Sequence, residues 1–124
     1  MTIIVGIHRE NDRGDILTLA QTSGLHVKWR GKEITVPYGF ESDGCSVPSI
    51  LWGLISPAIH PETLRASLVH DYIYREHPDG WTKADADELF YELMIEDGFP
   101  KWRAYAAYKG VDWFGRSAWE GDAE

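Results

Sequence analysis

The sequence has little of three things: cysteine, basic charge and long apolar runs. A single cysteine, Cys45, cannot form an intramolecular disulfide, so nothing in the chain requires an oxidising compartment. Twelve Lys and Arg residues stand against twenty Asp and Glu residues, and this net charge of −8 argues against a nucleic-acid-binding surface. No apolar stretch approaches the roughly 20 residues that span a bilayer, and no secretory leader pattern opens the chain. We therefore expect no nucleic-acid partner, no transmembrane segment, no signal peptide and a cytoplasmic location.

The 124 residues are enough for one domain, and six Trp, six Tyr and four Phe can build its core. The first part, residues 1–38, is β-rich, because apolar and polar residues alternate there over short runs. The expected strands are 2–8, 16–20, 25–29 and 34–38, and residues 30–33 form the hairpin turn of the last pair. Two glycines, a proline and a polar run then predict an ordered loop over 39–48.

The remaining part, 49–118, has helical patterning. The expected helices are 48–55, 61–76, 82–97 and 101–117, with Thr82 as the N-cap of the third and residues 120–124 frayed. Trp52, Trp102 and Trp113 are assigned to the core. The fold class is therefore α+β, a single domain over 1–124 in which a small antiparallel sheet precedes a bundle of three to four helices.

The helix 61–76 carries an unusual polar strip. Ser67, His70, Asp71 and Tyr74 share the face left by the apolar residues, and no Lys, Arg or Glu separates them. A face without long charged side chains is unlike a solvated one, so the strip is expected to face other protein groups or a cleft. His70 and Asp71 then point to two edges of one small site, which suits a base beside a metal ion.

A carboxylate from another element is needed to hold the imidazole of His70 in one tautomer. The next helix offers Asp85 and Asp87. On a helical wheel Asp87 lies at the edge of the apolar stripe, whereas Asp85 lies on the far side. We therefore predict that Asp87 is the inward residue and the partner of His70.

Other interpretations of these residues stay open. A His-Asp pair on a half-buried helix can be purely structural. The sequence Asp43-Gly44-Cys45-Ser46 is of a kind that is common in ordinary turns. The functional interpretation of that turn is a site where a carboxylate and carbonyl oxygens bind a hard cation such as Ca²⁺. A third hypothesis is a transition-metal phosphohydrolase with His60 or His77 as extra ligands, although His77 also fits a simple helix-end residue.

Two resemblances follow from these motifs. The run 39–48, the segments 70–74 and 86–90 and the helix ending at Gly115 resemble short phage and prophage proteins grouped as domain of unknown function 1353. The segment of about 40–115 is also similar to phospholipase A2, especially its prokaryotic branch. The shared features are an Asp-Gly-Cys-Ser loop, a His-Asp-x-x-Tyr helix, an Asp-x-x-Phe helix and a last helix ending in Phe-Gly.

The phospholipase resemblance implies a role for each matching residue. His70 would activate a water molecule, with Asp87 and Tyr74 orienting it. Asp71, Asp43 and a carbonyl near Gly44 would bind Ca²⁺. The implied activity is calcium-dependent hydrolysis of an ester, such as a membrane lipid during phage lysis or entry, in the bacterial cytoplasm or the virion. The alternative is a non-catalytic virion or host-interaction protein that keeps the His-Asp helix pair as scaffold and binds other phage proteins.

Overall fold

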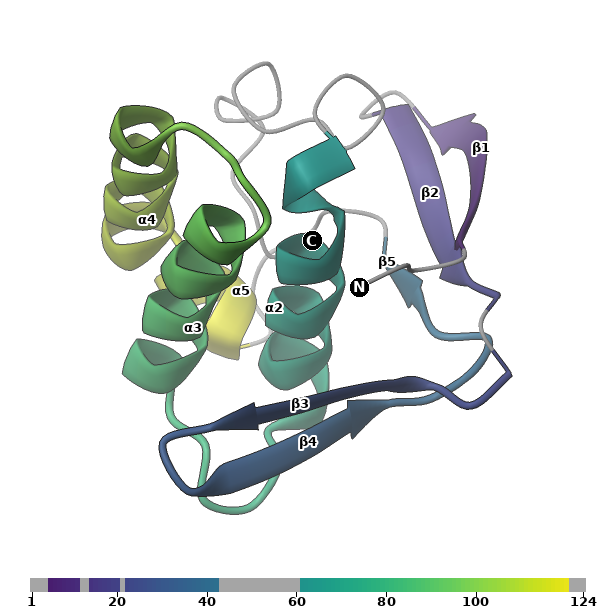
Figure 1. The fold of residues 1–124 in the computed structure, drawn as a ribbon, viewed down its shortest axis with the longest axis horizontal. Helices are drawn as coiled ribbons and strands as arrows, with labels where there is room; N and C mark the ends of the chain where they lie inside the picture. The colour runs from purple at the N-terminus through teal and green to yellow at the C-terminus, as the bar shows by residue number, and fades with distance from the viewer. Residues whose placement is uncertain (1–4, 12–13, 21, 43–60, 121–124) are drawn as a thin grey trace.

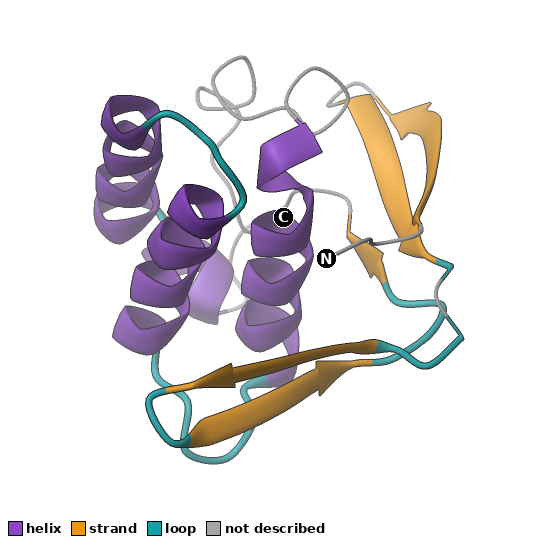
Figure 2. Ribbon diagram, in the orientation of Figure 1, coloured by secondary structure: helices purple, strands orange, loops and turns teal. Residues whose placement is uncertain are grey.

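The computed structural model describes residues 5–11, 14–20, 22–42 and 61–120, and it confirms the α+β class. Its strands are β1 (Val5–Asn11), β2 (Gly14–Leu19), β3 (Leu25–Trp29), β4 (Lys32–Val36) and β5 (Glu41–Ser42). Its helices are the 3₁₀ turn η2 (Pro61–Thr63), α2 (Leu64–Glu76), α3 (Lys83–Glu96), α4 (Lys101–Phe114) and α5 (Arg116–Glu120). The strands thus precede these helices, as the sequence predicts (Figure 2).

The strands form two antiparallel sheets rather than the single sheet that the alternation suggests. One sheet has the order β1-β2-β5 and the other is the β3-β4 hairpin. The prediction of a loop over 39–48 was wrong at its start, because Glu41–Ser42 pairs with Thr18 and Leu17 of β2. Backbone bonds between Leu19 and the pair Gly39 and Phe40 turn the chain back onto β2. Residues 43–48 and the expected helix 48–55 lie outside the described residues.

The β3-β4 hairpin turns in two residues, Arg30 and Gly31, fewer than predicted. Both have positive φ angles, 50° and 81°, as a type I′ turn requires. Alternate residues of the hairpin are buried: Leu25, Val27, Trp29, Ile34 and Val36. Figure 1 shows the hairpin crossing one end of α2 and α3, while the β1-β2-β5 sheet lies beside α2.

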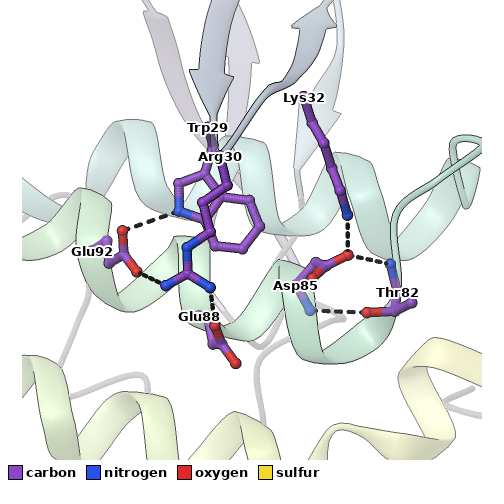
Figure 3. Close-up of polar contacts among 7 residues, drawn as sticks. All are labelled: Trp29, Arg30, Lys32, Thr82, Asp85, Glu88 and Glu92. Atoms are coloured by element: carbon purple, nitrogen blue, oxygen red, sulfur yellow. Dashed lines mark hydrogen bonds and ion pairs between the residues drawn. The ribbon is translucent and has the colours of Figure 1, made fainter.

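A polar clamp holds the hairpin on α3 (Figure 3). Trp29 Nε1 donates to Glu92 at 3.0 Å, and the Arg30 guanidinium bonds Glu88 and Glu92, each at 2.7 Å. Lys32 Nζ bonds the carboxylate of Asp85. Because these contacts join residues far apart in the chain, they fix the angle at which the hairpin meets the helices.

The helices pack in series, with α3 against both α2 and α4. Thr82 caps α3 as predicted, and Asp85 completes a reciprocal capping box. The predicted helix 101–117 is interrupted: α4 ends at Phe114, Gly115 follows, and Glu120, predicted to be frayed, belongs to α5. Within the ranges described, none of the helices has the length and apolar character that crossing a membrane requires.

The assignment of Trp102 and Trp113 to the core was wrong, since the two residues are 71% and 72% exposed. α4 instead turns a face of small side chains to the interior. This face consists of Ala104, Ala107, Gly110 and Val111. Small side chains let neighbouring helices approach closely, which leaves no room for an indole between them. Trp52 lies outside the described residues.

Candidate functional site

The polar strip of α2 faces the protein interior. Ser67, His70, Asp71 and Tyr74 are all buried, and His70 is only 1% exposed. The helix enters from the 3₁₀ turn η2 and ends at His77, whose left-handed backbone (φ 46°) stops it. One uninterrupted helix therefore holds the four side chains at fixed spacing.

Asp87 of α3 bonds His70, as the helical wheel predicts, and it also bonds Tyr74. Its Oδ1 atom lies 2.8 Å from His70 Nε2 and accepts a hydrogen bond of 2.7 Å from Tyr74 Oη. An ionised carboxylate can only accept, so the Nε2 atom of a neutral His70 carries the proton. Nδ1 is then the basic nitrogen of the ring, which is the arrangement that a general base requires.

Lys83 also belongs to this site, although the sequence patterns did not predict it. Its Nζ atom donates to Asp87 Oδ2 at 2.8 Å and to the carbonyl oxygens of Val111 and Asp112 at 3.1 and 3.2 Å. The spacing could have predicted this contact, because Lys83 and Asp87 are i, i+4 neighbours on the same helix. Both carboxylate oxygens of Asp87 are thus bonded, and the same ammonium ties the site to the end of α4.

The charge state of the site follows from these partners. Burial opposes the ionisation of Asp87, but His70, Lys83 and Tyr74 outweigh it and hold the pKa of this carboxyl below its ordinary value. Burial, with the charge of Asp87, raises the pKa of Tyr74 far above its ordinary value. Asp87 is therefore an anion and Tyr74 a protonated donor at neutral pH.

Aromatic rings restrict how His70 can move. The imidazole centroid lies 4.2 Å from the ring of Tyr74 and 4.6 Å from that of Phe90. Phe90 comes from the same α3 segment as Asp87, one turn further along. The imidazole is therefore fixed by its hydrogen bond and by contacts between rings.

Asp71 is as deeply buried as its neighbour, with 1% exposure, and its Oδ2 lies 3.4 Å from Arg75 Nε. The other predicted calcium ligands, Asp43 and Gly44, lie outside the described residues. Among the residues that are described, no group of three or more His, Cys, Asp or Glu side chains is arranged to hold a metal ion.

His77, the extra ligand of the transition-metal hypothesis, lies at the end of α2, as its position predicts. Its ring stacks on Trp119 of α5 at 3.8 Å, and its Nε2 lies 2.8 Å from the Trp119 carbonyl oxygen. His60, the other ligand of that hypothesis, is outside the described residues. In the structure, His77 joins α5 to α2.

Gly115 allows the close approach of Tyr74. A methyl group placed on this residue would lie 2.7 Å from Tyr74 Oη and 2.5 Å from the Val111 carbonyl oxygen. We expect Gly115→Ala to lower the free energy of unfolding by about 1–3 kcal/mol, because the methyl group crowds the Val111 carbonyl oxygen and pushes the Tyr74 hydroxyl away from Asp87. Urea unfolding monitored by circular dichroism measures this loss.

The control for Gly115→Ala is the same change in a Tyr74→Phe background, which removes the hydroxyl oxygen of Tyr74 and leaves the crowding against the Val111 carbonyl oxygen in place. The double variant should lose less stability than the sum of the two single variants. Strict additivity would contradict the proposed contact with the hydroxyl.

Comparison with known proteins places this domain in a family. Residues 18–111 match the family described as "Protein of unknown function (DUF1353)". The chain is also similar to "Uncharacterized protein y4jT" of Sinorhizobium fredii (strain NBRC 101917 / NGR234), with 34% identity over 85 residues. That match covers 68% of this chain and 25% of the relative, so the relative is much the longer protein. No solved structure matches. The chain belongs to the DUF1353 family of proteins of unknown function.

Proposed function

We propose that the chain is a phage-associated, calcium-dependent ester hydrolase of the phospholipase A2 type, with His70 as the general base. The observation that carries the proposal is that one buried carboxylate, Asp87, bonds both His70 Nε2 and Tyr74 Oη. This bonding fixes the tautomer whose Nδ1 can accept a proton. The arrangement of these side chains supports the activity more directly than the fold does, because a shared fold does not establish a shared reaction.

The proposed reaction uses water directly. His70 Nδ1 removes a proton from water as its oxygen attacks the ester carbonyl carbon. The ester C–O bond then breaks, and the imidazolium returns the proton to the leaving alkoxide. Asp87 stabilises the imidazolium, while Tyr74 and Lys83 hold the carboxylate in place. No covalent intermediate with the protein is required.

The calcium part of the proposal rests on ligand chemistry. Ca²⁺ is a hard cation that prefers carboxylate and carbonyl oxygens, and the buried carboxylate of Asp71 suits it. Asp71, Asp43 and a carbonyl at Gly44 would hold the ion. Bound there, Ca²⁺ would supply positive charge to the ester carbonyl oxygen.

The test is hydrolysis of phospholipid vesicles by wild type and by His70→Gln, with calcium and with a chelator. The Gln amide can still donate to Asp87 but has no basic nitrogen, so we expect roughly a 10²–10⁴-fold loss of rate without loss of folding. His77→Gln, the same exchange on the exposed end of α2, should retain activity. Equal rates for wild type and His70→Gln would refute His70 as the base.

A second candidate from another class is a non-catalytic interaction protein that keeps the His-Asp pair as scaffold. The 1% exposure of His70 and the bonding of both Asp87 oxygens favour it. Under this candidate the wild type hydrolyses no ester, and His70→Gln changes only the stability of the domain. The hydrolysis assay therefore separates the two candidates.

A further inference from the structure

Exposed aromatic side chains are concentrated on α4. Five large hydrophobic residues are exposed among those described, and four of them belong to this helix. They are Trp102, Tyr105, Trp113 and Phe114, which are between 52% and 72% exposed. Large exposed apolar surfaces on folded domains mark sites of interaction with a partner or a membrane. We call these four residues the α4 aromatic face.

The geometry of α4 places most of this face on one side of the helix. Trp102 and Trp113 are eleven residues apart, about three turns, and Tyr105 lies within about 80° of both around the axis. Phe114 extends the face at the helix end, where its ring lies 6.5 Å from that of Trp113. In Figure 1, α4 lies on the outside of the helical layer, away from α2 and the sheets.

The side of α4 that packs on the protein is made of the small residues. The aromatic side chains of α4 therefore do not contribute to the core of this domain. A helix that folds only to complete a core buries its largest apolar side chains, because burial of an aromatic ring contributes the most. Here that pattern is reversed. The indoles face outward, which indicates that the surface has a partner.

The charged residues of α4 indicate what kind of partner would bind this face. α4 carries three of the twelve Lys and Arg residues, Lys101, Arg103 and Lys109, but only one of the twenty Asp and Glu residues, Asp112. Two of the cations lie beside the rings. Arg103 Cζ is 5.6 Å from the Trp102 ring centroid, and Lys109 Nζ is 6.0 Å from that of Tyr105. In a chain of net charge −8, this helix is locally basic, and its partner should be anionic.

We propose that the α4 aromatic face docks on an anionic lipid bilayer. Trp and Tyr favour the bilayer interface, and Lys and Arg beside them contact anionic headgroups. The face is a single outward helix surface, which fits a planar partner better than a groove would. Two copies of this chain meeting through α4 would bring like charges together, so a second copy is disfavoured. The inference does not require His70 to be catalytic.

The test is co-sedimentation of the full chain with vesicles of ether-linked lipids, which contain no acyl ester that could be hydrolysed. We expect binding to vesicles rich in phosphatidylglycerol, weakening as salt rises, and little binding to pure phosphatidylcholine. The double variant Trp102→Ser and Trp113→Ser should bind at least about tenfold more weakly. Lys109→Glu should also weaken binding. Because Trp102 and Trp113 are exposed and Lys109 is only half-buried, circular dichroism should show all variants folded.

The matched control is Tyr38→Ser, which removes an aromatic ring that is 62% exposed but lies outside α4. It should bind vesicles like the wild type, and so should His70→Gln, which separates this result from the proposed hydrolysis. Absence of vesicle binding by the wild type would overturn the inference. So would unchanged binding of the tryptophan variant, a preference for single-stranded RNA over vesicles, or a dimer by light scattering that the tryptophan changes dissociate.

Discussion

Asp87→Ala is expected to lower the free energy of unfolding by about 3–5 kcal/mol, a large fraction of the stability of a small domain. The substitution removes the carboxylate that accepts hydrogen bonds from His70, Tyr74 and Lys83. The polar groups of these three residues then stay buried or half-buried and lose that acceptor, which is unfavourable. Urea unfolding followed by circular dichroism measures the difference in unfolding free energy between wild type and variant.

Asp112→Ala is the matched control, because Asp112 is an exposed acid and only its backbone oxygen contacts Lys83. It should change stability by no more than about 0.5 kcal/mol. The pH dependence gives a second check. Folding lowers the pKa of Asp87, so its ionisation stabilises the fold above about pH 4 and this contribution is lost as the pH falls further. A stability profile in acid that is identical for wild type and Asp87→Ala would contradict the ionised site.

Trp29→Ala is expected to cost about 3–5 kcal/mol, because it removes the aromatic anchor of the β3-β4 hairpin. The indole stacks on Trp81 with 5.7 Å between the ring centroids, and its Nε1 bonds Glu92 of α3. Without the indole, the remaining links of the clamp are exposed or half-exposed ion pairs, which contribute little individually. Thermal and urea unfolding measure the loss.

Trp102→Ala provides the control for this second prediction, since it deletes the same side chain from an exposed position. Its unfolding free energy should stay within about 0.5 kcal/mol of the wild type. Hydrogen exchange at the amides of β3 and β4 should also rise in Trp29→Ala, because the hairpin loses its hold on α3. Equal destabilisation by the two tryptophan changes would contradict the role of Trp29 as the anchor of the hairpin.

Much of the helical half could be predicted because its signals are local. The Thr82 cap, the extent of α3 and the end of α2 before Pro78 depend on residues within one or two turns. The pairing of His70 with Asp87 was also predictable, because the wheel placed Asp87 but not Asp85 at the edge of the apolar stripe. The roles of these residues in chemistry stay predictions.

The sequence by itself determined which segments form α2 and α3 and which of their polar residues turn inward, since spacing along a helix fixes both. Only the tertiary structure decided which face of α4 is covered. That helix has one face of small residues and another with aromatic rings. Helical periodicity identifies both faces but does not tell which of them is buried. Close packing on α3 selected the small face and left Trp102 and Trp113 exposed. The contacts of Lys83 with Val111 and Asp112, and of Gly115 with Tyr74, likewise depend on how distant helices meet.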